Sequence, residues 1–149
     1  RNIMLKKLSD FKDGNYQIVS NSNIKEDIIK NSFFAVSKSG TVSLEISKYE
    51  VPSIIIYKMN PINFFFIKRM VKTKFANIIN IINQKEIIPE LLQSECNSQE
   101  IFNSVNYFIQ KPELLKKQKE LVKKTIKSMQ NDELSSLNAA NIVLSYIKN

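Results

Sequence analysis

The chain has 149 residues, of which 43% are hydrophobic, and this length and composition predict a single domain, residues 1–149, with one hydrophobic core. It has 22 basic and 14 acidic residues, so its formal net charge of +8 favours anionic partners such as phosphates or an anionic membrane. It contains no histidine and a single cysteine, Cys96, which excludes histidine-based catalysis, histidine-containing metal sites and any disulfide within the chain.

Short apolar runs alternate with helical patterns through the first 60 residues. The runs are nearly continuous and rich in isoleucine, valine and phenylalanine, which is typical of strands in a parallel sheet covered on both faces. In chain order we expect the end of a helix at 4–8, a strand at 16–20, a short helix at 24–29, a strand at 33–37, a helix at 41–49 and a strand at 53–57.

The rest of the chain is predominantly helical. Pro61 opens a helix to about residue 72, a strand or extended segment is expected at 75–82, and Pro89 opens a short helix at 89–93. Further helices follow Asn97, whose side chain can cap the first of them, and Pro112. The last helix is expected to bury Leu137, Ala140, Ile142, Val143 and Ile147. The predicted class is α/β, an open parallel Rossmann-like sheet flanked by helices, with a helical C-terminal tail.

A glycine turn between a predicted strand and a predicted helix is the most informative local pattern. Ligands bind beyond the carboxyl ends of strands in an open α/β sheet, which puts Gly40 at a binding edge. Glycine allows close approach to a ligand, and the free N–H groups that start the next helix favour a phosphate, with hydroxyls from Ser39 and Thr41 beside them. Glu45 follows one helical turn later, where a carboxylate can accept both hydroxyls of a ribose. The same pattern also occurs in ordinary capping turns, so residue types alone leave both interpretations open.

Several segments taken together resemble the C-terminal domain of the lipid-A-disaccharide synthase family. Their order and intervals match that family from about Phe34 to Cys96. The segments are Ser39–Glu45, Val51–Pro52, Tyr57–Pro61, Lys68–Lys72 and Pro89–Cys96. The resemblance implies a glycosyltransferase with two Rossmann-like domains that joins UDP-diacylglucosamine to lipid X, releases UDP and inverts the configuration of the transferred sugar.

The same resemblance implies which residues bind the donor. Ser39, Gly40 and Thr41 are expected to bind the diphosphate, and Glu45 the ribose. Two further donor-binding residues are Lys58, where the family usually has arginine, and Asn80, which matches an asparagine of the family. The acceptor-binding residues and the general base of the family lie in an N-terminal domain that this sequence lacks. We therefore expect no catalytic residue in this chain and no activity of the chain alone. We also expect no metal and no cofactor, because no cluster of cysteine and carboxylates is visible.

The predicted helix after Pro61 combines aromatic and basic residues. Helical spacing places an aromatic ring among cations, which suits the headgroup layer of an anionic membrane or the acceptor lipid. These residues are Phe64, Phe65, Lys68, Arg69 and Lys72. The alternative is that the phenylalanines belong to the core or to a dimer interface and that the cations are solvated. No apolar run approaches the ~20 residues needed to span a bilayer, so any membrane contact is expected to be peripheral.

The expected location is the cytoplasm, peripheral on the inner membrane, because the start of the sequence shows no export signal. The expected partners are UDP-diacylglucosamine, lipid X through the acceptor domain, an anionic membrane surface and a second copy in a possible homodimer. Nucleic acid is not among them. The lysines between residues 116 and 127 have no accompanying nucleic-acid-binding motif and are expected to form a solvated face.

Three other functions stay open from the sequence. One is the donor domain of another UDP-sugar transferase, resembling the murein-intermediate transferase, in which a glycine, a threonine and a glutamate are similarly spaced. Another is a non-catalytic basic module on anionic membrane or nucleic acid, which would lack UDP affinity and lose its binding with salt. The third is a folded but idle remnant of a split gene. The choice between UDP-diacylglucosamine and UDP-N-acetylglucosamine would separate the two enzymes.

Overall fold

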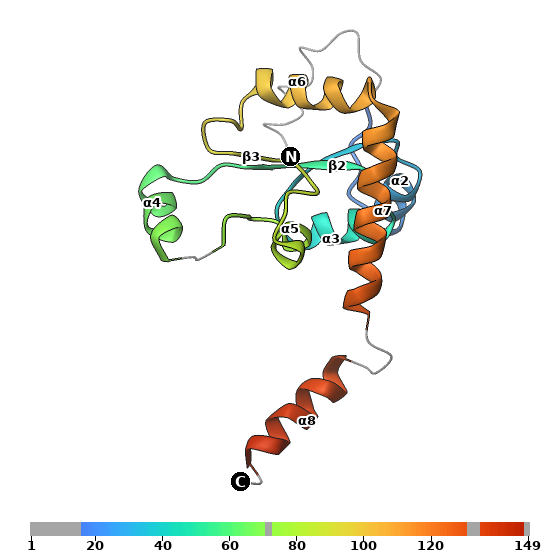
Figure 1. The fold of residues 1–149 in the computed structure, drawn as a ribbon. Coiled ribbons are helices and arrows are strands. Elements are labelled where there is room, and N and C mark those ends of the chain that lie inside the picture. The colour runs from blue at the N-terminus through green and yellow to red at the C-terminus, as the bar shows by residue number, and fades with distance from the viewer. Residues whose placement is uncertain (1–15, 71–72, 131–134, 148–149) are drawn as a thin grey trace.

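The computed structural model describes residues 16–70, 73–130 and 135–147, and its centre is a parallel sheet of three strands in the order β1-β2-β3. The strands are β1 (Ala35–Lys38), β2 (Ser53–Tyr57) and β3 (Glu90–Leu92). The helices are α2 (Ser22–Lys30), α3 (Thr41–Lys48), α4 (Pro61–Met70), α5 (Ile78–Asn83), α6 (Ser98–Ile109), α7 (Pro112–Met129) and α8 (Ser135–Ile147). Figure 1 shows α6 over one face of the sheet, α3 and α5 over the other, and α7 running along the side in contact with all three. This arrangement confirms the predicted α/β class.

The central strand β2 is covered on both faces, which is why its sequence is almost wholly apolar. Ser37 of β1 lies opposite Ile55 of β2, and Ile55 lies opposite Glu90 of β3. Ile55 packs into a core cluster with residues from α5, α7 and the segment before β3, which are Ile79, Ile87, Ile88 and Val122. Burial of each such aliphatic side chain contributes roughly 1.5–3 kcal/mol, so this cluster is the main source of stability near the sheet.

A buried glutamine of α7 fastens the helix to the sheet. The side-chain oxygen of Gln118 accepts a hydrogen bond from the Ser53 N–H at 2.7 Å, and its amide group donates to the carbonyls of Ser53 and Ile87, both at 3.1 Å. The glutamine therefore satisfies three buried backbone groups at the start of β2 and before β3. Such groups are costly to leave without partners, so α7 and the sheet hold each other in place.

Asparagine side chains cap the start of several helices, including α4, where Asn60 accepts from the Ile62 N–H at 2.9 Å. The side chain of Asn21 caps α2, that of Asn77 caps α5, and that of Asn97 accepts from the Glu100 N–H at 3.0 Å at the start of α6. The predicted cap at Asn97 is confirmed. Each cap satisfies an N–H group that the helix itself leaves without a partner.

Three predicted elements are wrong in type. Residues 16–20 form no strand, residues 78–83 form helix α5 instead of an extended segment, and residues 90–92 form strand β3 instead of a helix. The Asn77 cap starts α5 by accepting from the Ile79 N–H at 2.9 Å. The proline at position 89 precedes a strand, because its carbonyl accepts from the Ile55 N–H at 2.8 Å and starts the pairing of β3 with β2.

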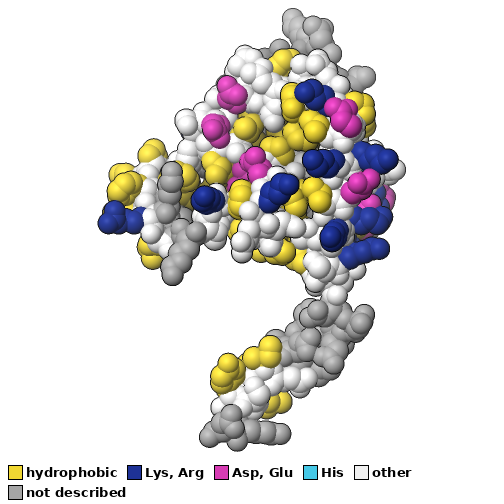
Figure 2. Space-filling view, in the orientation of Figure 1, with side chains coloured by type: hydrophobic (Ala, Val, Ile, Leu, Met, Phe, Trp, Pro, Cys, Tyr) yellow, Lys and Arg dark blue, Asp and Glu magenta, His cyan; other side chains and the backbone are white. Residues whose placement is uncertain are grey.

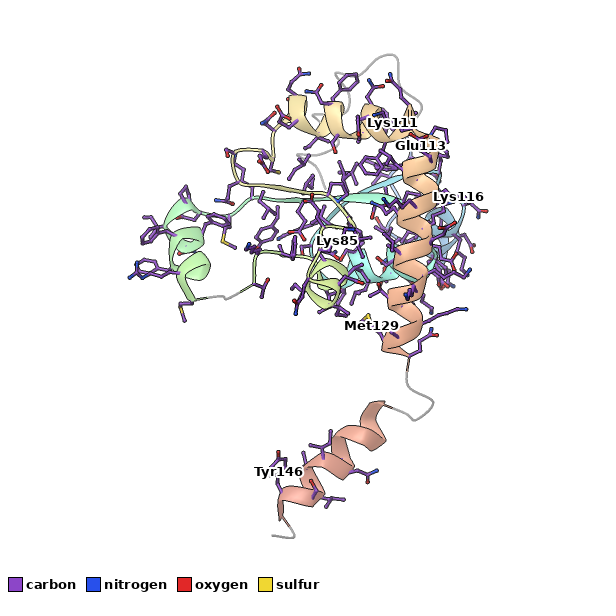
Figure 3. The ribbon with its side chains drawn as sticks, in the orientation of Figure 1. Lys85, Lys111, Glu113, Lys116, Met129 and Tyr146 are labelled. Carbon is purple, nitrogen blue, oxygen red and sulfur yellow. The ribbon has the colours of Figure 1, made fainter. Side chains whose placement is uncertain are left out.

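The last helix, α8, lies apart from the sheet and its covering helices (Figure 1). The prediction that it buries Ala140, Ile142 and Val143 is wrong, since these side chains are exposed. Figure 3 shows Tyr146 of α8 projecting away from the rest of the chain. The side chains of Leu137 and Ile147, and the helix end expected at 4–8, lie outside the described residues.

Candidate functional site

The turn from β1 to α3 centres on Gly40, whose backbone has φ 144° and ψ −162°. Residues with a side chain rarely adopt this region, so the turn depends on glycine. A Cβ atom added at Gly40 would meet no heavy atom within 4 Å, which means that open space lies beside the backbone. A ligand can therefore approach the main chain closely at this point.

The amino end of α3 has no side-chain cap within the described part of the chain. Helix α7 likewise begins without a side-chain cap, whereas α2, α5 and α6 each begin with a capping asparagine. The first N–H groups of a helix carry a partial positive charge and favour an anion. The start of α3 combines such groups with the open space beside Gly40.

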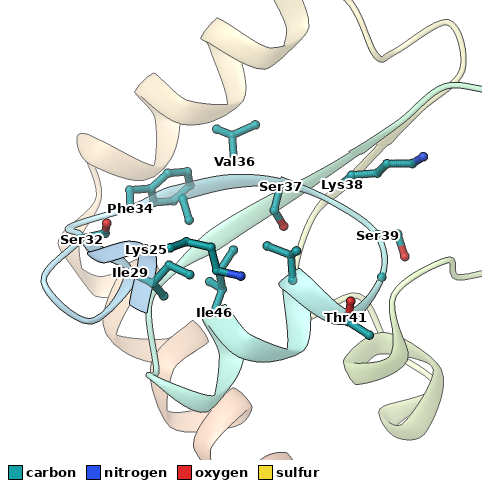
Figure 4. Close-up of a pocket in the computed structure, with 13 residues that line it drawn as sticks. Lys25, Ile29, Ser32, Phe34, Val36, Ser37, Lys38, Ser39, Thr41 and Ile46 are labelled. Carbon is teal, nitrogen blue, oxygen red and sulfur yellow. The ribbon is translucent and has the colours of Figure 1, made fainter. Parts of the chain in front are cut away.

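A cavity of about 600 Å³ lies between α2, β1 and α3. Ser39, Gly40 and Thr41 line one end of it, where β1 passes into α3, and Figure 4 shows Lys25 toward the other end. The remaining lining includes the apolar side chains of Ile29, Phe34, Val36, Val42 and Ile46. The cavity thus joins the uncapped start of α3 to a largely apolar wall.

Ser37 contributes a buried hydroxyl to the same cavity (Figure 4). Its side chain is 8% exposed, and its Oγ atom has no hydrogen-bond partner among the described residues. A buried hydroxyl without a partner is unfavourable. Ser37 therefore adds a hydroxyl with unused hydrogen-bonding capacity to the wall of the cavity.

Glu45 lies beside a second, smaller cavity of about 290 Å³ between α2 and α3. Its carboxylate is 2.6 Å from the ammonium of Lys25. Lys25 and Ile29 line both cavities, so the two are neighbours. Glu45 follows Thr41 by one helical turn, but it does not line the cavity at the Gly40 turn.

Two side chains that line the second cavity, Glu26 and Tyr49, belong to a hydrogen-bonded group that also includes Lys30. The hydroxyl of Tyr49 donates to the carboxylate of Glu26, and Lys30 pairs with the same carboxylate at 3.0 Å. The hydrogen bond from Tyr49, followed by the interaction with Lys30, lowers the pKa of Glu26. Conversely, Glu26 raises the pKa values of Tyr49 and Lys30. Glu26 and Lys30 are exposed and Tyr49 is half-buried, and Glu26 and Tyr49 form part of the cavity wall.

Two predicted donor-binding side chains are already engaged within the fold. The hydroxyl of Ser39 donates to the Ala76 carbonyl at 2.7 Å. The side chain of Asn80 is fully buried. Its oxygen accepts from the N–H groups of Ile87 and Ile88, and its amide donates to the Ile88 carbonyl and to Glu90. In this arrangement neither side chain has a free donor to offer to a ligand.

Two lysines lie where strands end at the same edge of the sheet. Lys58 follows β2 and is exposed, but it does not line the cavity at the Gly40 turn. Lys38 ends β1, lines that cavity, and has its ammonium 5.0 Å from the centre of the Tyr57 ring. Lys38 was not predicted from the sequence, although its position directly before Ser39 was a signal for it. Lys25 was not predicted either, because only tertiary packing brings α2 to Glu45.

Helix α4 forms a lobe at the edge of the molecule, where Figure 2 shows hydrophobic and basic side chains together. Phe65 is 63% exposed, and Phe66 and Met70 are also exposed, whereas Phe64 is half-buried. The Phe65 and Phe66 rings pack edge to face with their centres 5.9 Å apart. Arg69 is exposed on the same helix. The side chain of Lys68 and the whole of Lys72 lie outside the described residues.

The described residues contain no group of three or more cysteine or acidic side chains placed to hold a metal ion. None of the described helices has both the length and the apolar character needed to cross a bilayer. The lysines of α7 at 116, 117, 119, 123, 124 and 127 are exposed, as predicted, and that at 123 pairs with Glu50 at 2.8 Å. Figure 3 shows Lys116 on the outward side of this helix.

A comparison with protein families matches residues 2–143 to the family described as lipid-A-disaccharide synthetase. Among curated proteins, the lipid-A-disaccharide synthase of Sulfurihydrogenibium sp. (strain YO3AOP1) is 39% identical over 107 residues, which are 70% of this chain and 28% of the relative. That of Rhodospirillum centenum (strain ATCC 51521 / SW) is 30% identical over 124 residues, 83% of this chain and 31% of the relative. That of Rickettsia prowazekii (strain Madrid E) is 40% identical over 91 residues, which are 61% of this chain and 23% of the relative. The chain therefore spans less than a third of the length of these relatives.

Proposed function

Since the chain belongs to the lipid-A-disaccharide synthase family, we propose that it is the nucleotide-sugar-binding part of a glycosyltransferase of lipid A biosynthesis. The donor in this proposal is UDP-diacylglucosamine, the acceptor is lipid X, and UDP leaves with inversion at the transferred sugar. The relatives are named for synthesis of the lipid A disaccharide, and the chain matches the same family over most of its length.

The observation that carries the proposal is the Gly40 turn. It combines a glycine-dependent backbone, open space in front of that backbone and an uncapped helix start. The diphosphate of the donor would lie against the N–H groups of Gly40 and Thr41, where the partial charge of α3 stabilises an anion. The hydroxyl of Thr41 would add a hydrogen bond.

The carboxylate of Glu45 would bind the two ribose hydroxyls. Both hydroxyls donate to the carboxylate, and hydrogen bonds to a charged acceptor are stronger than neutral ones. Lys25 now occupies this carboxylate in an ion pair that is about half exposed. Because exposed ion pairs are worth little, roughly 0–1 kcal/mol, the ribose can displace or share the ammonium at small cost.

The remaining predicted donor residues take different parts in the proposal. The side chains of Ser39 and Asn80 act by supporting the turn, since their hydrogen bonds are used within the fold. Lys58 and Lys38 contribute positive charge at the edge where the strands end. The buried hydroxyl of Ser37 would bind a polar group of the donor inside the cavity.

The acceptor-binding residues and the general base are proposed to belong to the portion of the relatives that the chain does not match. The chain matches 28% of the Sulfurihydrogenibium enzyme. We therefore expect the chain to bind UDP without transferring sugar on its own, and we expect neither a metal nor another cofactor in the reaction.

Contact with the membrane is proposed at helix α4. Its exposed phenylalanines would enter the headgroup layer, and Arg69 would pair with anionic headgroups. This contact would hold the donor site near acyl-chain substrates at the inner membrane surface, with the protein on its cytoplasmic side. Dimerisation stays a prediction, which sedimentation of the chain at several concentrations would test.

The test is calorimetric titration of UDP into the chain and into Glu45→Ala. We expect saturable heat with the parent chain and weaker binding by the variant. No saturable heat, or equal affinity of the two proteins, would contradict the proposal. Competition between UDP-diacylglucosamine and UDP-N-acetylglucosamine then distinguishes this donor from that of a murein-intermediate type of transferase.

A further inference from the structure

Glu90 is a buried acidic residue that the proposed donor site does not use. It begins β3, is 8% exposed, and lies across the sheet from Ile55. One carboxylate oxygen accepts from the Ala76 N–H at 2.7 Å. The other accepts from the Asn77 N–H at 3.0 Å and from the Asn80 side-chain amide at 2.7 Å. A buried carboxylate with three donors is well satisfied, so Glu90 fixes the backbone at residues 76 and 77.

The two residues that Glu90 holds each contact one side of the Gly40 turn. The carbonyl of Ala76 accepts from the Ser39 hydroxyl at 2.7 Å. The side-chain amide of Asn77 donates to the Ser43 hydroxyl at 3.1 Å. The turn is therefore held on both sides by a dipeptide that is itself fixed to the sheet.

Ser43, which Asn77 contacts, in turn holds the peptide between residues 40 and 41. Its hydroxyl donates to the Gly40 carbonyl at 2.6 Å, and its N–H donates to the same carbonyl at 3.1 Å. The carbonyl and the N–H of a trans peptide point in opposite directions. Because the Gly40 carbonyl is held toward Ser43, the Thr41 N–H points the other way, away from the Ser43 hydroxyl.

We propose that Glu90 is a positioning residue for the diphosphate: through Asn77 and Ser43 it sets the orientation of the Gly40–Thr41 peptide before the ligand arrives. The proposal rests on the proposed function, because it assumes that this turn binds the diphosphate of UDP. Preorganised N–H groups bind an anion without first reorienting, so the geometry that Glu90 imposes raises affinity for the phosphates and not for the nucleoside.

Glu90→Gln is the first variant, because it keeps the size of the side chain and replaces one accepting oxygen with an amide. The backbone at residues 76 and 77 then loses one of the hydrogen bonds that hold it beside the turn. We expect affinity for UDP to fall about 10-fold, the loss of one hydrogen bond to a charged group, and affinity for uridine to stay unchanged. The amide ¹H–¹⁵N shifts of Gly40 and Thr41 should move. Glu95→Gln is the matched control, since this exposed carboxylate makes no hydrogen bond to Glu90, Ala76 or Asn77 in the described part of the chain.

Ser43→Ala tests the same link at its other end, in case the Glu90 variant does not fold. It removes only the hydroxyl that joins Asn77 to Gly40. We expect the same selective loss of UDP affinity, and its recovery in Ser43→Thr, which restores a hydroxyl. A merely structural role would lower the melting temperature and weaken UDP and uridine binding by the same factor.

The outcomes separate this inference from the proposed function. Equal losses for UDP and uridine, or unchanged shifts of Gly40 and Thr41 in both variants, would overturn the positioning role of Glu90. Absence of UDP binding by the parent chain would contradict the proposed function instead. In that case the shifts of the turn, recorded without ligand, still decide whether Glu90 orients the peptide.

Discussion

The ammonium of Lys25 on α2 lies 2.6 Å from the carboxylate of Glu45 on α3, at the boundary between the two cavities. The pair makes a test of the ribose assignment possible. Glu45→Ala should weaken UDP binding roughly 10- to 100-fold, the loss of hydrogen bonds to a charged group, and should leave 2′,3′-dideoxy-UDP binding unchanged. Lys25→Ala is the control for loss of the ion pair. Calorimetry with both nucleotides measures the effect, and an equal loss for the two would contradict a ribose contact.

Replacement of Gly40 tests the turn itself. In Gly40→Ala the backbone must hold φ 144° with a side chain present, a strain of about 1–3 kcal/mol, although the added methyl group meets no neighbour. We expect a lower free energy of unfolding in urea and weaker UDP binding. D-alanine introduced by peptide ligation is the control, because the mirror image of this conformation is the ordinary extended region. A D-alanine protein as unstable as Gly40→Ala would show that crowding, not backbone strain, is responsible.

The group of Tyr49, Glu26 and Lys30 predicts a pH effect. Because the Tyr49 hydroxyl is the largest cause of the lowered pKa of Glu26, Tyr49→Phe should raise that pKa toward its ordinary value of 4.5. A carboxyl with a lowered pKa stabilises the fold above its unfolded pKa, and this stabilisation is lost as the pH falls through the folded value. The two proteins should therefore differ in stability at neutral pH and converge in acid. Carboxyl ¹³C NMR titration measures the pKa, and Tyr107→Phe should leave it unchanged.

The exposed phenylalanines and Arg69 of helix α4 lead us to expect binding to anionic vesicles. Phe65→Ser combined with Phe66→Ser should reduce sedimentation with phosphatidylglycerol vesicles at least 10-fold, since burial of each ring contributes roughly 1.5–3 kcal/mol. Arg69→Glu should reduce it about fivefold or more, because one basic residue near such a surface is worth ~1 kcal/mol. Phe102→Ser is the control, since Phe102 of α6 is as exposed as Phe65. If the control binds as weakly as the α4 variants, α4 is not the contact.

Replacement of the buried amide of Gln118 should lower the stability of the fold without changing the candidate site. Gln118→Leu keeps the volume but leaves backbone groups of Ser53 and Ile87 without partners. We expect a loss of at least about 1–3 kcal/mol, the cost of one such group. Urea denaturation measures it. Lys117→Ala on the exposed side of the same helix should change stability by less than about 0.5 kcal/mol.

Sequence patterns correctly predicted those helices and strands whose local residue pattern matches their burial in the fold. Strand β2 lies at 53–57, as expected, because continuous apolar residues fit a central strand. The cap at Asn97 and the helix after Pro112 also follow local rules. The short β3 was missed because its pairing partner, β2, lies more than 30 residues away in the sequence and Pro89 fits either element. The expected strand at 16–20 has an apolar run but no pairing within the described residues.

The candidate site was predictable where it depends on neighbours in the chain. Ser39, Gly40 and Thr41 line one cavity, and Glu45 follows one turn later beside the next. The parts that were missed come from tertiary contacts. Lys25 reaches Glu45 only through the packing of α2 on α3, and Glu90 acts on the turn through residues 76 and 77. Asn80 was expected to contact the ligand, whereas in the structure its side-chain oxygen accepts hydrogen bonds from the segment before β3.

Helix α7 contacts α3, α5 and α6 and, through Gln118, the backbone of the sheet. The Gly40 turn thus depends for its stability on residues 70 positions or more further along the chain. The turn can therefore take its final shape only after α7 has left the ribosome, so nascent chains in which α7 is still inside the exit tunnel should remain sensitive to protease. Chains in which a C-terminal linker places Gln130 outside the tunnel should resist it.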